Sequence, residues 1–224
     1  MSKIKVMSEL LANKIAAGEV VERCANVVKE LVENAIDAKA SIIKIDLIDG
    51  GLTSISVSDN GVGMDKSDAM LAFQRHATSK IYKDDDLFFI ETLGFRGEAL
   101  ASIASVSEID METAYEDVGT HIHLKGGILV TNEATQARVG TVITVTNLFY
   151  NTPARLKYLK SEVAELNNCT QFIEKLALSK PEISFVLTNN GRVVVRVSGS
   201  GNLLKTIHEI YGLNVSSAML EIKA

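Results

Sequence analysis

The stretch 20-VVERCANVVKELVENAIDAKA-40 is the most informative part of the sequence, because it predicts a long helix with two different faces. Glu30, Asn34 and Asp37 are spaced by four and three residues, so they lie along one helical face. Apolar residues occupy the remaining surface: Val27, Val28, Leu31, Val32 and Ile36. The helix can therefore be buried on its apolar side while carboxylate, amide and carboxylate groups face a cavity.

A second stretch, 54-SISVSDNGVG-63, supplies the partner of that polar face. Residues 55–58 alternate apolar and polar, which is typical of a half-buried strand, and the strand ends at Asp59. Gly61 and Gly63 lack a Cβ atom, so the chain can adopt positive φ there and approach a flat ligand closely. An ionised Asp59 only accepts hydrogen bonds, so it favours the amine of adenine over the carbonyl of guanine by roughly 1 to 3 kcal/mol. The two stretches together predict an ATP site.

A third segment, 94-GFRGEAL-100, predicts the phosphate end of this site. It precedes a predicted helix, whose free N–H groups and positive end favour phosphate, and its glycines allow close approach. The preceding residues 76–86 are charged and poorly periodic, which predicts a mobile loop acting as a lid. Lys80 and Arg96 either touch the nucleotide and its lid or make ordinary surface contacts. His76 has no Asp or Cys at ligand spacing and is assigned no chemistry.

These three segments resemble the GHKL ATPases, which include gyrase, heat-shock chaperones, histidine kinases and MutL. Three flanking segments are similar to the MutL family of DNA mismatch repair ATPases in particular: 13-NKIAAGEVV-21, 77-ATSKI-81 and 147-NLFYNTPAR-155. The similarity runs in order from about Leu10 to Lys160, so it covers most of the chain.

The resemblance implies a Mg²⁺-dependent ATPase in which Glu30 is the catalytic residue that orients and deprotonates the attacking water. Mg²⁺ prefers oxygen ligands and keeps several waters, so the amide oxygen of Asn34 and phosphate oxygens form a sufficient ligand set. The resemblance places Thr141 in the adenine pocket beside Asp59. The expected nucleotide-binding residues are Asn34, Asp37, Asp59, Gly63, Thr78, Ser79, Lys80, Gly94, Phe95, Arg96, Gly97, Glu98, Ala99, Leu100 and Thr141.

The resemblance also implies partners and a slow cycle. ATP is expected to order the lid and to drive homodimerisation, in which an N-terminal arm crosses to the second protomer. This arm lies within residues 1–21, which contain the amphipathic stretch 10–17, and the chain can bend at Gly18. The other expected partners are a mismatch-recognition protein of the MutS type and DNA, which is bound weakly and mainly by a longer protein. The alternative is a non-hydrolysing ATP-sensing association module.

Composition limits the remaining possibilities. With 224 residues, 46% of them hydrophobic, the chain can bury a sizeable core. The net charge of −5 and pI of about 5.5 argue against a generic polyanion binder. Arg155, Lys157 and Lys160 form the notable basic cluster, which is either a solvated face or a local DNA contact. No run resembles a signal peptide or a membrane span, so a cytoplasmic protein is expected, and Cys24 and Cys169 are expected to be packing residues.

The order of elements predicts an α+β two-layer sandwich, in which a mixed, largely antiparallel sheet carries helices on one face. The expected strands are 41–49, 53–59, 106–114, 121–124, 128–134, 141–146, 183–188, 192–197 and 220–222, and the expected helices are 20–40, 65–73, 97–104, 161–179 and 203–211. Residues 1–200 are expected to form the ATP-binding domain. Residues 201–224 are expected to be a linker and the truncated start of a second α/β domain, which by resemblance supplies a lysine to the γ-phosphate.

Overall fold

The computed structural model describes residues 5–7, 9–79 and 97–220. Within them, eight strands form one sheet in the order β5-β4-β3-β6-β2-β1-β7-β8. The strands are β1 (Ile42–Ile48), β2 (Ser54–Asp59), β3 (Glu108–Ala114), β4 (Val118–Lys125), β5 (Ile128–Gln136), β6 (Thr141–Thr146), β7 (Ser184–Asn189) and β8 (Arg192–Ser198). The helices are α1 (Glu9–Val20), α2 (Cys24–Asp37), α3 (Lys66–Leu71), α4 (Ala99–Ser105), α5 (Pro153–Leu156), α6 (Glu162–Ser179), α7 (Leu203–Tyr211) and α8 (Leu213–Ser216).

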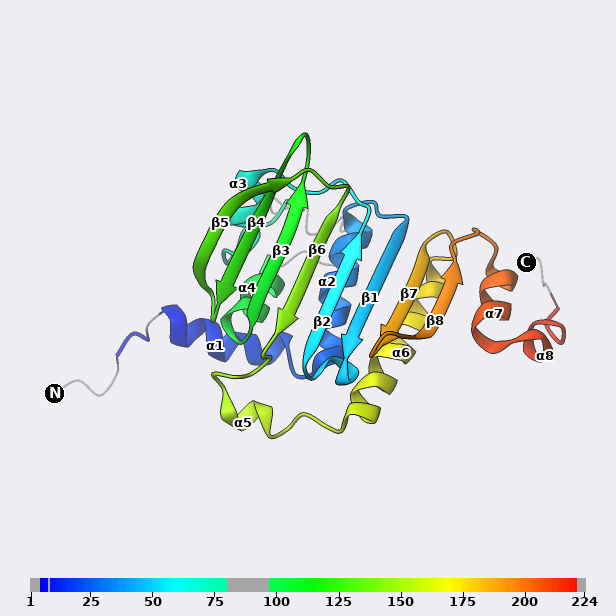
Figure 1. Cartoon of the computed structure of the whole chain (residues 1–224). Coiled ribbons are helices and arrows are strands. Elements are labelled where there is room, and N and C mark those ends of the chain that lie inside the picture. Colours follow the sequence, from blue (N-terminus) through cyan, green and yellow to red (C-terminus); the bar gives the residue numbers. More distant parts are fainter. Residues whose placement is uncertain (1–4, 8, 80–96, 221–224) are drawn as a thin grey trace, which may run out of the picture.

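The sheet is mixed but largely antiparallel, as the sequence predicts. β1 and β7 run parallel, and the other neighbouring strands run antiparallel. Helices α2, α4 and α6 lie behind one face of the sheet (Figure 1). The α+β two-layer sandwich is therefore confirmed.

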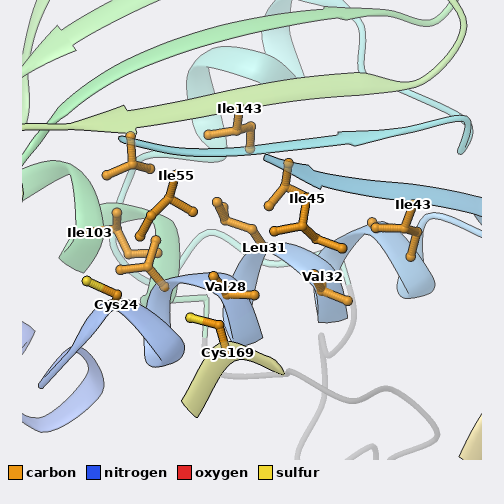
Figure 2. Packing of buried hydrophobic residues seen from close by; sticks show 14 of the residues in the cluster. Cys24, Val28, Leu31, Val32, Ile43, Ile45, Ile55, Ile103, Ile143 and Cys169 are labelled. Atoms are coloured by element: carbon orange, nitrogen blue, oxygen red, sulfur yellow. The ribbon is translucent and has the colours of Figure 1, made fainter. Parts of the chain in front are cut away.

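The core lies between this sheet and α2. Figure 2 shows Leu31 of α2 pointing toward Ile45 and Ile55 of the central strands, and Val28 and Val32 belong to the same buried cluster. Strands β1 and β2 bury alternate residues, which is the pattern of a sheet with one face on the core. Cys24 and Cys169 are buried in the same cluster, and burial together with the nearby Glu165 raises the pKa of the Cys169 thiol to about 12. Both cysteines are therefore packing residues, as expected.

The N-terminal helices differ from the prediction. The helix expected over 20–40 begins only at Cys24, because Arg23 is extended with φ −154°. The Asn26 side chain accepts hydrogen bonds from the backbone N–H groups of Glu22 (3.2 Å) and Arg23 (3.1 Å), which fixes this start. α1 continues through Gly18, where the sequence allows a bend, to Val20, and the chain turns at residues 21–23.

The other elements follow the expected order, with small changes. β4 starts at Val118, three residues earlier than expected, because residues 119–120 pair with both β3 and β5 and Val118 pairs with β5. The short helices α5 and α8 were not predicted as separate elements. The strand expected at 220–222 lies almost wholly outside the described residues. None of the helices in the described ranges combines the length and apolar character needed to span a bilayer.

Candidate nucleotide site

Helix α2 presents the predicted polar face. Glu30, Asn34 and Asp37 are each partly exposed, whereas Val28 and Leu31 on the opposite side are buried. The Glu30 side chain retains 19% of its accessible surface. The spacing in the sequence therefore places two carboxylates and an amide on one accessible face, as expected for residues three and four apart on a helix.

An ion-paired lysine joins this face and was missed from the sequence. Lys29 Nζ lies 3.0 Å from Glu30 Oε1 and 2.8 Å from Glu33 Oε2. Burial lowers the pKa of Lys29, but the hydrogen bonds and charges of Glu33 and Glu30 together leave it raised. Burial raises the pKa of Glu33, and the hydrogen bond from Lys29 opposes this. The i, i+4 spacing of Lys29 and Glu33 was the available signal.

Asp59 ends β2 and is tied to two backbone donors. Its Oδ1 accepts hydrogen bonds from the N–H groups of Gly61 (2.7 Å) and Thr141 (3.4 Å). Burial raises the pKa of Asp59, while these two hydrogen bonds and the charge of Arg138 oppose the rise. Both donors bond to Oδ1 and so orient the carboxylate. The other carboxylate oxygen, Oδ2, can then accept a hydrogen bond from a ligand donor.

The turn after Asp59 packs against the end of α2. The Val62 N–H donates to the Ala38 carbonyl at 3.0 Å. A Cβ atom at Gly61 would lie 2.6 Å from the same carbonyl oxygen, so this approach requires glycine. The Asn60 side chain accepts from the N–H groups of Ser41 and Ile42 and fixes the turn to the start of β1. These contacts bring the aspartate turn to the helix that carries Glu30 and Asn34.

Two threonines build the wall beside Asp59. Thr141 Oγ1 and Thr113 Oγ1 are 2.8 Å apart, and both residues are buried. Thr113 Oγ1 also accepts from the Met64 N–H at 3.0 Å. Gly63 has φ +69°, and a Cβ atom there would lie 1.8 Å from the Ala114 carbonyl oxygen. Sequence reasoning singled out Thr141 and Gly63 but missed Thr113, although its place in an alternating strand predicted an inward side chain.

The phosphate segment is described only in part. Gly97 has φ +61°, and its carbonyl accepts from the His76 N–H at 3.1 Å. Glu98 Oε1 lies 3.4 Å from His76 Nδ1 and 3.7 Å from Arg75 Nη2. Residues 75–77 and 97–98 therefore lie side by side, ahead of α4.

The remaining expected residues are placed as follows. Ala99 and Leu100 begin α4, which packs against both α1 and α2. Thr78 is half-buried and Ser79 is exposed. Four expected residues lie outside the described residues: Lys80, Gly94, Phe95 and Arg96.

The donor set fits an adenine nucleotide with a hard cation. A partly buried carboxylate beside two buried threonines suits the amine-bearing edge of adenine. The oxygen-bearing face of α2 suits Mg²⁺, for which one amide oxygen and phosphate oxygens are enough. The tight approaches at Gly61 and Gly63 leave the chain close-packed around this turn, so its position is fixed before any ligand binds.

Comparison with known proteins agrees with this geometry. Residues 22–146 match a family described as histidine kinase-, DNA gyrase B-, and HSP90-like ATPase. The DNA mismatch repair protein MutL of Geobacillus sp. (strain WCH70) is 55% identical over 225 residues, which cover 100% of this chain and 36% of that protein. MutL of Lactococcus lactis subsp. cremoris (strain SK11) is 55% identical over 99% of this chain and 34% of its own length. The chain thus spans about a third of the length of these curated relatives.

Solved structures of DNA repair proteins are also similar to this chain. The Aquifex aeolicus MutL ATPase domain complexed with ADP is similar with a TM-score of 0.68 and 30% identity, over 86% of this chain and 70% of that one. The N-terminal domain of a DNA repair protein has a TM-score of 0.78 and 31% identity, over 92% of this chain and 62% of that one.

Proposed function

The chain belongs to the histidine kinase-, DNA gyrase B- and HSP90-like ATPases and, within them, to the MutL family, and from this membership we propose that it binds ATP with Mg²⁺ and hydrolyses it slowly during DNA mismatch repair. The observation that carries the proposal is Asp59. It is a partly buried carboxylate oriented by Gly61 and Thr141, at the end of a strand and against the helix that bears Glu30.

The proposed roles follow from chemistry and position. Asp59 accepts a hydrogen bond from the adenine amine, with Thr141 beside it. Asn34 offers an amide oxygen to Mg²⁺, which when bound would offset the negative charge of the phosphates. Glu30, one turn earlier on α2, orients the attacking water and takes its proton.

The ion pair with Lys29 holds the Glu30 side chain in place. Lys29 occupies one lone pair of Glu30 Oε1, and a carboxylate has further lone pairs that can accept from water, so Glu30 can keep this contact while it acts as a base. The second candidate function is a non-hydrolysing ATP-sensing association module. Turnover separates the two, since the module would bind ATP and release no phosphate above background.

The wider role is proposed on the family membership. ATP would order the lid at residues 76–86 and promote homodimerisation through the N-terminal arm, and the whole protein would act with a MutS-type partner and with DNA. We also propose that residues 1–200 form the ATP-binding domain and that 201–224 are a linker and the start of a second domain.

Calorimetric titration tests the binding proposal directly. With Mg²⁺ present, ATP should bind and GTP should bind at least about tenfold more weakly, because a guanine carbonyl facing Asp59 leaves two acceptors unsatisfied. Equal affinities for the two nucleotides would remove Asp59 from the base pocket.

A further inference from the structure

The segment 147–155, which the proposed site does not use, contacts the helix that starts at the phosphate end. The Asn151 side-chain amide donates to the Ser105 carbonyl at 2.9 Å, and the Phe149 N–H donates to the Val106 carbonyl at 2.7 Å. Both acceptors lie at the C-terminal end of α4. Phe149 is completely buried and has φ +65°, a strained conformation for a residue with a side chain. The segment is therefore held rigidly against α4.

The end of the same segment contacts α1. Arg155, in α5, donates from Nη2 to the carbonyl of Ile15 at 3.3 Å. A Cβ atom at Gly18 would lie 2.0 Å from Nη2, so the guanidinium lies directly on the surface that this glycine leaves open. Arg155 Nη1 is buried without a hydrogen-bond partner among the described residues. Arg155 is partly exposed, but one guanidinium nitrogen is buried and another is bonded to α1, so this side chain is not a free surface cation, whereas Lys157 and Lys160 are exposed.

Gly18 is explained by this contact and by no backbone requirement. It lies inside α1 without positive φ, where alanine would ordinarily stabilise the helix. The side chain that alanine would displace is the flexible end of Arg155. Glycine here therefore provides the space for the guanidinium.

We infer that segment 147–155 is a clamp that holds α1 and α4 together and that Arg155, seated on Gly18, is a positioning residue for the nucleotide site. α1 packs against α4, whose N-terminal end at Ala99 follows the proposed phosphate segment. α1 also leads through residues 21–23 into α2, which carries Glu30. Arg155 thus acts on nucleotide binding through two helices without touching the nucleotide.

A double-mutant cycle with amide hydrogen exchange tests the clamp without nucleotide. Arg155→Ala and Gly18→Ala should each speed exchange of the α1 amides about tenfold, since each removes a charge-assisted hydrogen bond. The double variant should exchange no faster than Arg155→Ala alone, because alanine at position 18 then only favours the helix. Lys157→Ala, on the same turn, is the matched control and should change nothing, and exchange in β6 should stay constant throughout.

Enzyme kinetics distinguish a positioning role of Arg155 from general destabilisation of the protein. The effect on nucleotide rests on the proposed function: Arg155→Ala should raise KM for ATP about tenfold and leave kcat within about twofold, whereas loss of folded protein would lower the apparent kcat and keep KM. If Arg155→Ala does not fold, Arg155→Gln replaces it with the same expected shifts.

The results separate the clamp from the proposed function. Slower α1 exchange in Gly18→Ala, or unchanged exchange in Arg155→Ala, would overturn the clamp. Faster α1 exchange with an unchanged KM would overturn its link to the nucleotide site. If the parent protein fails to bind ATP, the proposed function fails while the exchange result still decides the contact between Arg155 and Gly18.

Discussion

The backbone N–H of Thr141 lies 3.4 Å from Oδ1 of Asp59, although the two residues are 82 positions apart in the chain. The contact joins β6 to the end of β2, its antiparallel neighbour in the sheet. A second donor, the Gly61 N–H, reaches the same oxygen at 2.7 Å. The two donors orient the carboxylate, and in the proposed adenine pocket this orientation reduces the ordering cost of binding.

Asp59→Asn should weaken ATP binding about tenfold to a hundredfold, because the amide can turn its donor toward the adenine amine and loses the charge-assisted bond. Titration calorimetry with ATP and Mg²⁺ measures this. Thr53→Ala, at an exposed hydroxyl away from the site, is the control and should bind ATP like the parent. An Asn variant with the parent affinity would contradict the base-recognition role.

Asp59→Asn should also make the protein more stable than the parent, and the size of this gain should depend on pH. Burial raises the pKa of Asp59 above its ordinary value of 3.8, so the folded protein binds this proton more tightly than the unfolded chain does. As pH rises from 3.8 through the raised folded pKa, the unfolded chain ionises first and the parent protein loses stability. The stability of Asp59→Asn relative to the parent should therefore increase across this window and level off above it. Chemical unfolding at several pH values would show this trend, and a difference independent of pH would refute it.

Glu30→Ala should retain ATP binding and lose turnover by about 10² to 10⁴, since a general base acts on the water and contributes little to holding the nucleotide. Phosphate release and calorimetric affinity are measured on the same preparation. Because Glu30 pairs with Lys29, Glu33→Gln serves as a control that alters the same ion-pair network without removing the proposed base. Equal turnover in Glu30→Ala and the parent would exclude the catalytic role.

Gly63→Ala and Gly191→Ala form a matched pair with nearly equal φ, +69° and +74°. At Gly191 a Cβ atom meets nothing within 4 Å, so only the left-handed conformation costs free energy, about 1 to 2 kcal/mol. At Gly63 the Cβ atom would lie 1.8 Å from the Ala114 carbonyl oxygen, and we expect a loss above about 3 kcal/mol and no ATP binding. Similar losses of unfolding free energy in both variants would show that the close approach at Gly63 is unimportant.

The sequence was sufficient for the parts of this molecule that depend on periodicity and glycine. Alternation located β1 and β2, and the spacing of Glu30, Asn34 and Asp37 placed them on one face of α2. It failed where a side chain overrides local preference. The break at residues 21–23 depends on the Asn26 side chain. The guanidinium of Arg155 lies against Gly18 of α1, a contact that no local pattern can reveal.

ATP should also control the association of two copies of the chain. Val6, Met7 and Ile15 are 99%, 54% and 52% exposed, so the N-terminal arm presents apolar surface that a second protomer could bury. ATP can shift the population toward a dimer only as far as its affinity for the two states differs. We therefore expect a monomer without nucleotide and partial dimerisation with a non-hydrolysable ATP analogue and Mg²⁺, reduced by deleting residues 1–12. Light scattering measures the mass, and Asp59→Asn should stay monomeric at analogue concentrations that saturate the parent. If the parent has the same mass with and without the analogue, even at high protein concentration, nucleotide does not control association through this arm.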